Sequence, residues 1–385
     1  NVSSATSSQG RTRGIAVLVA SILLIIGAVV YIALARANSA GSDFNGAGNG
    51  VEQVVEIPEG STLTAMGPAL EEKGIVRSDK AFQNAVMSHP DADNIQPGFY
   101  RLQEKMSAED AVAALLDPVN KVDMLKIPGG STLMDVKVVG GDTRFGIYSN
   151  ISSVSCGSEG TNQDCVSVKE LHDVAANADP TALGVPEWAV EPVNAHRGDP
   201  KRIEGLIAPG EYIVDPNADA ETILTDLITR STEKYNSTDI VGRAQAVGLS
   251  PYDLLTAASL VEREAPEGEF DKVARVILNR LKEPMRLEFD STVNYGLESV
   301  ELATGDTDRK KVTPWNTYAK DGLPETPIAS PSEDAIRAME HPAEGQWLFF
   351  VTVDDKGTTI FSNTFEEHQA NVQQAYDSGI LDSRR

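Results

Sequence analysis

The longest unbroken hydrophobic run lies near the start of the chain, at residues 14–35 (GIAVLVASILLIIGAVVYIALA). Its 22 residues carry no charge, and at about 1.5 Å of rise per residue they would span the roughly 30 Å core of a bilayer. Two arginines precede the run and one follows it, which favours an inner N-terminus, at 1–13, and an outward-facing body. We therefore expect a transmembrane helix. The alternative is a cleaved signal peptide, because Ala33-Leu34-Ala35 resembles a cleavage site.

Two pairs of similar segments follow a Gly-, Ser- and Asn-rich stretch at 36–50, which we predict to be a flexible linker. VEIPEGSTL at 55–63 and LKIPGGSTL at 125–133 each have the pattern of a strand, a Pro/Gly turn and a Ser or Thr that caps a helix. QPGFYRL at 96–102 and APGEYIV at 208–214 each precede a helical pattern. Such β-α-β-like units suit the binding of an extended polymer, or they reflect duplication for stability alone.

The two repeat units differ in length. The first pair of segments lies 70 residues apart and the second pair 112 apart, so the second unit carries an insertion of 42 residues. We place it at about 136–200, and because this stretch is rich in Ser, Asn, Asp and Gly we expect surface loops. The predicted segments are thus 51–120 for the first unit and 121–236 for the second.

From about residue 237 the pattern becomes that of a separate α+β domain, placed at 237–385. Amphipathic helices and a closing hairpin are predicted at 250–264, 270–285, 332–342, 347–353 and 358–365. The fold class expected for the chain is therefore α+β, with one N-terminal transmembrane helix.

Composition narrows the possible partners. The formal net charge of −24 argues against nucleic acid, because phosphate binding needs clustered Lys and Arg. There is no GxxxxGK loop, and the five histidines show no ligand spacing, so we expect no nucleotide, metal or other cofactor. Eight residues separate Cys156 from Cys165. Outside the cytoplasm a disulfide between them is favoured over two free thiols.

The candidate chemistry lies in 237–385. Glu262 follows Ala-Ser-Leu-Val on a largely apolar helix, where burial disfavours the ionised form, as a general acid at a glycosidic oxygen requires. The alternative is a solvated helix end paired with Arg263. Polar and aromatic side chains that suit a sugar groove follow, although each singly also fits a structural role: Glu264, Asn279, Arg280, Glu288, Asp290, Thr292, Tyr295, Asn316, Thr317 and Tyr318.

Six stretches, in order, together resemble the endolytic murein transglycosylases, the YceG-like family. They are ASLVERE at 258–264, VARVILNRL at 273–281, MRLEFDSTVNYG at 285–296, TPWNTY at 313–318, GLPETPIASP at 322–331, and WLFFV with FSNTFEEH at 347–351 and 361–368. The anchor and the repeated segments also match the layout of the family, which implies a LysM-like module at 51–120 ahead of the catalytic region.

The resemblance implies that Glu262 is the catalytic acid and base. The reaction would be non-hydrolytic cleavage of the β-1,4 bond between N-acetylmuramic acid and N-acetylglucosamine in nascent strands, which leaves 1,6-anhydro ends and limits strand elongation. No second carboxylate is needed. It also implies a protein of the cytoplasmic membrane, with its catalytic domain outside the cytoplasm, whose partners are peptidoglycan strands, the membrane and cell-wall synthesis proteins.

The chain departs from the family at three positions. Glu288, Ser291 and Thr359 stand where many members have Gln, Pro and His, so no site histidine is expected at 359. Two other functions stay open: a lysozyme-like hydrolase with Asp290 as its second carboxylate, and a non-catalytic scaffold that binds the cell wall.

Overall fold

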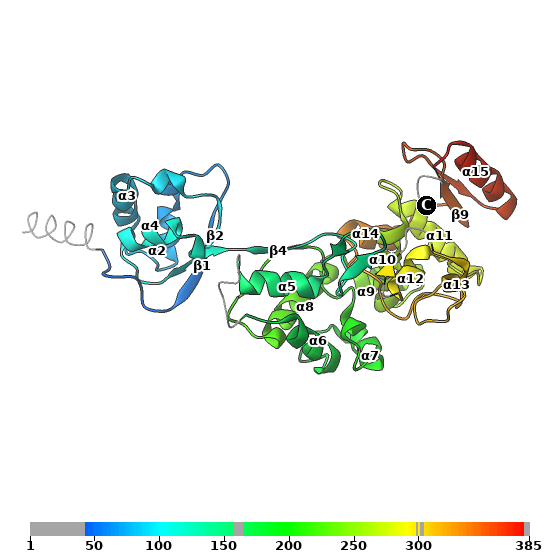
Figure 1. The fold of residues 1–385 in the computed structure, drawn as a ribbon, viewed down its shortest axis with the longest axis horizontal. Coiled ribbons are helices and arrows are strands. Elements are labelled where there is room, and N and C mark those ends of the chain that lie inside the picture. The colour runs from blue at the N-terminus through cyan, green and yellow to red at the C-terminus, as the bar shows by residue number, and fades with distance from the viewer. Residues whose placement is uncertain (1–42, 158–164, 298, 301–303, 381–385) are drawn as a thin grey trace, which may run out of the picture. The chain divides into compact units, whose positions relative to one another are not determined.

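The computed structural model describes residues 43–157, 165–297, 299–300 and 304–380, and shows a mixed α/β protein (Figure 1). The chain divides after Val122 into two compact units, each described here by itself. The predicted membrane helix at 14–35 lies outside the described residues. Among the residues that are described, no helix is both long and apolar enough to cross a bilayer.

The first unit is a three-stranded antiparallel sheet with order β1-β2-β3, accompanied by three α-helices. Phe82, Leu70 and Val112 are fully buried in its core. Its elements are β1 (Glu52–Ile57), α2 (Gly67–Glu72), α3 (Asp79–Ser88), β2 (Gly98–Gln103), α4 (Ala108–Leu116) and β3 (Lys121–Val122), with 3-10 turns at Leu63–Met66, Ala92–Asn94 and Pro118–Asn120.

The second unit is mainly helical, and one hydrophobic core extends through it from Leu125 to Met339. The predicted segments 121–236 and 237–385 both contribute to that core. Its helices are α5 (Ile147–Cys156), α6 (Val168–Asn177), α7 (Glu187–Ala195), α8 (Ala220–Ser237), α9 (Ile240–Val247), α10 (Pro251–Glu264), α11 (Phe270–Lys282), α12 (Asp290–Tyr295), α13 (Asp306–Arg309), α14 (Glu333–Glu340) and α15 (Phe365–Asp377), with a 3-10 turn at Pro200–Ile203.

Three small sheets complete the second unit. One is the antiparallel pair β4-β7, one has the order β6-β5-β8 with β5 and β8 parallel, and one is the predicted C-terminal hairpin. The strands are β4 (Met124–Ile127), β5 (Val136–Val138), β6 (Thr143–Arg144), β7 (Gly210–Ile213), β8 (Ser299–Val300), β9 (Phe349–Thr352) and β10 (Thr359–Ser362).

The sequence repeat is also a repeat of structure. β1 pairs with β2, and β4 with β7, so that Ile57 lies opposite Gly98 and Ile127 lies opposite Gly210. The tyrosine two positions after each glycine donates its hydroxyl to the backbone carbonyl four residues before it, at 2.6 and 2.7 Å. The two strand pairs thus share one register and one tyrosine hydrogen bond.

The expectation that a Ser or Thr caps a helix after each IP-G-ST-L segment is wrong. Thr62 makes no side-chain capping bond, and after the second segment the chain enters β5 instead of a helix. In both segments the serine closes the turn: Ser61 and Ser131 donate their hydroxyls to the carbonyls of Pro58 and Pro128, each at 2.7 Å. A hydroxyl used in this way makes a local turn that competes with helix capping.

The expectation of surface loops at 136–200 is also wrong, because this stretch forms α5, α6 and α7, which pack into the core. Ile147 and Ile151, four residues apart on one helix face, are fully buried. Ser167 and Glu170 form a capping box at the start of α6. The polar composition of the stretch concealed this amphipathic spacing.

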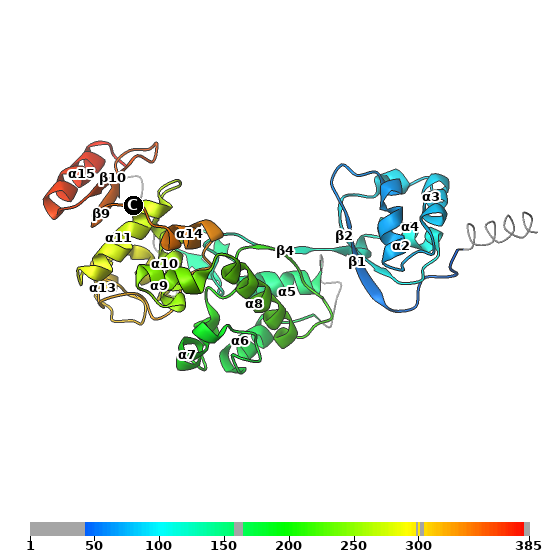
Figure 2. The same cartoon turned by 180° about the vertical axis from the view of Figure 1, so that it is seen from behind.

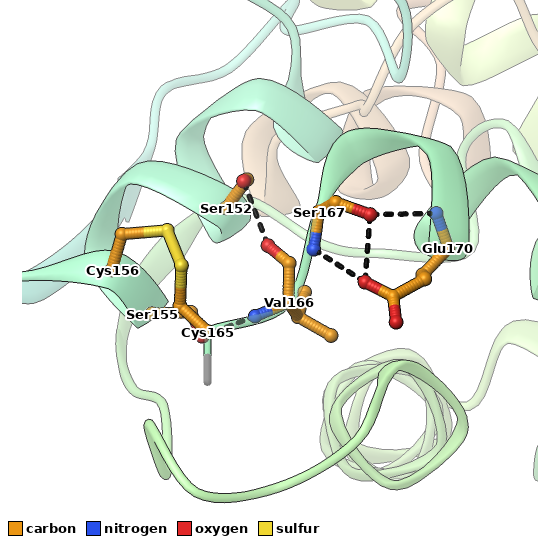
Figure 3. Close-up of a disulfide and its surroundings, with 7 residues drawn as sticks. All are labelled: Ser152, Ser155, Cys156, Cys165, Val166, Ser167 and Glu170. Carbon is orange, nitrogen blue, oxygen red and sulfur yellow. Dashed lines mark hydrogen bonds between the residues drawn. A yellow bond between two sulfur atoms is a disulfide. The ribbon is translucent and has the colours of Figure 1, made fainter. Parts of the chain in front are cut away.

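A disulfide joins Cys156, at the end of α5, to Cys165 just before α6 (Figure 3). Beside it, the Val166 amide donates to the Ser155 hydroxyl at 3.1 Å, and the Ser152 hydroxyl donates to the Val166 carbonyl at 2.8 Å. The predicted pairing is therefore present, and it fixes the entry to α6.

The helix that carries the candidate acid lies at the centre of the second unit. α10 contacts α9, α11 and α14, as both views show (Figures 1 and 2). Its start is defined by Ser250, whose side chain accepts the amide of Asp253 at 3.0 Å, and by Pro251 at the first helical position. Every residue from Leu254 to Val261 is buried, so the helix is held on several sides.

Candidate active site

Glu262 lies at the first position after the buried part of α10 and is half-buried. Its Oε2 accepts two hydrogen bonds from Ser332, one from the amide at 2.9 Å and one from the hydroxyl at 2.5 Å. Ser332 is also the N-cap of α14, since its hydroxyl accepts the amide of Ala335 at 3.2 Å. The first turn of α14 therefore holds the Glu262 carboxyl group in place, at the helix end that favours negative charge.

The turn of the second repeat covers the other oxygen of Glu262. A Cβ on Gly129 would lie 2.4 Å from Glu262 Oε1, so no larger residue fits at 129 without moving the carboxyl group. Gly130 donates its amide to the Ser330 carbonyl at 2.9 Å, and Ser330 donates to the Ser131 carbonyl at 2.7 Å. This turn is thus joined by backbone hydrogen bonds to the segment that leads into Ser332.

A cavity of about 490 Å³ opens beside this turn. Gly129 and Gly130 form part of its wall, and the Glu262 carboxyl group lies next to Gly129. Tyr295, at the end of α12, lines it as well and stacks edge-on against Trp315 at 5.2 Å between ring centroids. An aromatic wall next to polar groups suits a sugar ring.

Glu204 connects the two sides of the cavity from inside the core. It is fully buried, and it accepts the Leu133 amide at 3.1 Å and the Tyr295 hydroxyl at 2.8 Å. Burial raises the pKa of Glu204 to about 7, and hydrogen bonds from Leu133 and Tyr295 oppose that rise. Leu133 ends the repeat turn and Tyr295 ends α12. Because Glu204 binds both residues, it fixes the position of the repeat turn relative to α12.

Glu264, two residues after Glu262, faces the start of α12. Its Oε1 accepts the Ser291 amide at 3.2 Å. Burial raises the pKa of Glu264 and the neighbouring Asp290 adds to this, while hydrogen bonds from Ser291 act against it. The side chain anchors α12 to α10.

Asp290 is held in a network of side chains. Arg309 donates to both of its oxygens at 3.0 and 3.1 Å, and the hydroxyls of Thr304 and Tyr318 reach Oδ1 at 2.7 and 2.9 Å. Burial and the adjacent Asp290 carboxylate raise the pKa of Tyr318. With its oxygens occupied in this way, Asp290 is arranged as an anchor for α12, which weakens its candidacy as a second catalytic carboxylate.

The other predicted polar residues near α12 stabilise the local backbone. Thr292 and Thr317 are buried, their hydroxyls lie 2.9 Å apart, and Thr317 also accepts the Phe289 amide at 3.0 Å. Asn316 is buried and donates to the carbonyls of Lys311 and Arg309, at 2.5 and 3.0 Å. These side chains shape α12 and the loop after α13.

The predicted residues on and after α11 have similar roles. Asn279 donates to the Trp347 carbonyl at 2.9 Å, and Arg280 donates to the Leu348 carbonyl at 2.6 Å, so both tie α11 to the segment that leads into β9. Glu288 is exposed, with φ of +53°, and its amide donates to the Thr317 carbonyl at 3.2 Å. None of the three lines the cavity beside Glu262.

Comparison with known proteins identifies the family of the chain. The profile of the YceG-like family matches residues 55–374, well over half of the chain.

The chain belongs to the YceG-like family.

Similar proteins include an endolytic murein transglycosylase of Bacillus subtilis, 28% identical over 319 residues that make up 82% of each chain. An endolytic murein transglycosylase of Streptococcus pneumoniae is 27% identical over 341 residues, 85% of this chain but 59% of the pneumococcal protein. Among solved structures, a YceG-like protein of Listeria monocytogenes superposes with a TM-score of 0.54 and 25% identity, covering 84% of this chain and 99% of that one.

Sequence reasoning missed several residues of this YceG-like site. Ser332 was noted only as the first residue of the helix predicted at 332–342, whereas it also binds Glu262. Gly129 and Gly130 were noted only as part of a repeat, although that repeat was itself the signal that could have placed them. Glu204 left no signal in the sequence, because only the fold shows that this glutamate is buried.

The described residues hold no group of three or more His, Cys, Asp or Glu arranged to bind a metal ion.

Proposed function

We propose that this chain is an endolytic murein transglycosylase with Glu262 as its acid and base. The observation that carries the proposal is the position of Glu262, which is held by Ser332 and lies next to Gly129 in the wall of a cavity of about 490 Å³. The relatives named endolytic murein transglycosylases support the choice of peptidoglycan as substrate.

In the proposed reaction, protonated Glu262 donates its proton to the oxygen that links C1 of N-acetylmuramic acid to N-acetylglucosamine. The C1–O bond breaks and C1 gains oxocarbenium character. The C6 hydroxyl of the same muramyl residue attacks C1, and its proton passes to the Glu262 carboxylate, which restores the acid. A 1,6-anhydro end forms and no water is consumed.

The neighbours of Glu262 suit the second half of this cycle. The two hydrogen bonds from Ser332 stabilise the carboxylate that exists between the two proton transfers. They also hold one oxygen in place, so that the other, next to Gly129, is the one that faces the cavity wall. One carboxyl group then serves as acid and base in turn.

The proposal extends to the place and partners of the enzyme. The chain would be anchored in the cytoplasmic membrane by residues 14–35, with both units outside the cytoplasm. The disulfide between Cys156 and Cys165 supports an oxidising compartment. The first unit would be a LysM-like module that holds glycan, cleavage would limit the elongation of nascent strands, and cell-wall synthesis proteins would be partners.

The test compares full-length protein in detergent with Glu262→Gln, on uncross-linked glycan strands, with products weighed by mass spectrometry. Glu267→Gln is the matched control, since Glu267 is an exposed glutamate five residues further on. We expect 1,6-anhydro ends, one water lighter than reducing ends, and a loss of at least about 100-fold in rate for Glu262→Gln only. Reducing ends would instead indicate a hydrolase. Strands that bind but are never cut would indicate a scaffold.

A further inference from the structure

The cavity beside Glu262 is lined by cations in a chain whose formal net charge is −24. Arg144, Lys201 and Arg263 all lie in its wall. The one carboxylate in the same wall belongs to Asp135, which accepts the Gly146 amide at 2.7 Å. Positive charge is thus concentrated in the wall of this cavity.

These three cations have no carboxylate partner within ion-pair distance in the part of the chain that is described. Arg263 donates to the Gly130 carbonyl at 3.3 Å, and Lys201 Nζ lies over the Trp315 ring at 4.2 Å. Burial and the nearby Arg144 guanidinium lower the pKa of Arg263. Glu264 and Glu262 act on Arg263 in the opposite direction, whereas Arg144 and Arg263 repel each other, and an anionic ligand would relieve that repulsion.

We propose that this cavity binds the anionic substituent on C3 of a muramyl unit, with Arg144 and Lys201 as its carboxylate-binding residues. This proposal rests on the proposed function and adds the chemical group that the enzyme recognises. C1 and C3 belong to the same sugar ring, so a carboxylate on C3 lies within one sugar of the bond that Glu262 would break. Tyr295, in the same wall, presents its ring to the sugar.

Two sources can supply that carboxylate. In a strand with peptide stems the lactyl group is amide-linked, and the negative charge lies on the stem. In a strand from which the stems have been removed, the lactyl carboxylate itself is free. The preference of the wild-type enzyme between these two kinds of strand identifies the source.

The experiment measures kcat and KM of the full-length enzyme on stem-bearing strands, on stem-free strands, and on both after conversion of their carboxylates to neutral amides. Arg144→Gln is the main variant, because Arg144 is exposed and its replacement leaves the core intact. The control is Lys137→Gln, on the adjacent strand β5, which removes the same charge from an exposed residue outside the cavity wall.

We expect Arg144→Gln to raise KM about tenfold on a carboxylate-bearing strand, with kcat within about twofold, and Arg144→Lys to recover part of the loss. On the neutral strands Arg144→Gln should equal wild type. Equal KM values for Arg144→Gln and Lys137→Gln on every strand would overturn the subsite.

If the proposed function is wrong, the wild-type protein will cleave none of these strands. Strand affinity is therefore also measured in a Glu262→Gln background, with and without Arg144→Gln. A dissociation constant about tenfold weaker with Arg144→Gln supports the subsite independently of catalysis, and an unchanged one overturns it.

Discussion

Replacing Glu204 with Gln should change how the stability of the second unit depends on pH. The folded state raises the pKa of Glu204 from 4.5 to about 7, chiefly through burial. Between these two pH values Glu204 binds more protons in the folded state than in the unfolded chain. Its contribution to the free energy of unfolding is therefore greatest below about pH 4.5 and falls as the pH rises towards 7. The shift corresponds to a loss of about 3 kcal/mol across that range.

The neutral amide of Gln cannot ionise, so Glu204→Gln should remove this loss. At pH 5 the variant should be less stable than wild type by about 1 kcal/mol, because an amide NH₂ replaces an oxygen that now accepts from Leu133 or Tyr295. At pH 8.5, where wild-type Glu204 is ionised in the core, the variant should be more stable by about 2 kcal/mol. The two stability curves therefore cross.

Urea unfolding followed by tryptophan fluorescence measures this directly, because Trp188, Trp315 and Trp347 all lie in the second unit. The matched control is Glu211→Gln, an exposed glutamate on β7. A difference between Glu204→Gln and wild type that stays constant from pH 5 to pH 8.5 would refute the reasoning.

Two further predictions concern the surroundings of Glu262. Gly129→Ala places a Cβ 2.4 Å from Glu262 Oε1 and should lower kcat on glycan strands at least about tenfold. The control Gly141→Ala, whose Cβ has its nearest contact at 3.4 Å, should leave kcat unchanged. Equal kcat values for the two variants would contradict this prediction. Ser332→Ala and Ser250→Ala each remove a helix cap and should each lower the free energy of unfolding by about 1 kcal/mol. Only Ser332→Ala also loses a hydrogen bond to Glu262, so only this variant should lower kcat. Equal kcat values for the two would show that Ser332 acts as a cap alone.

Much of the local structure could be predicted from the sequence. The helices α10, α11 and α14 and the hairpin β9–β10 have strong periodic patterns, and they lie where those patterns placed them. The proximity of Cys156 to Cys165 in the chain suggested their disulfide. The polar stretch 136–200 was misread, because its average composition hid the few apolar positions at helical spacing that bury α5, α6 and α7.

Two of the residues named from the sequence lie at the candidate site, Glu262 beside the repeat turn and Tyr295 in the cavity wall. Glu262 stood out by its position at the end of an apolar helix, while most of its predicted companions proved to be anchors such as Asn316 and Arg280, which bind backbone carbonyls. A polar side chain in a loop has the same sequence signature whether it binds a sugar or a carbonyl. Only its neighbours in space distinguish the two cases.

By itself the sequence determined what depends on neighbours along the chain: the periodic helices, the caps, the repeated strand and turn, and the glutamate at the end of α10. The tertiary structure alone decided which distant segments meet. It placed Gly129 and Ser332 on opposite oxygens of Glu262, and it buried Glu204 between the repeat turn and α12. The physical reason is that these contacts join residues 70 or more positions apart, where burial in a shared core brings them together and no local pattern records them.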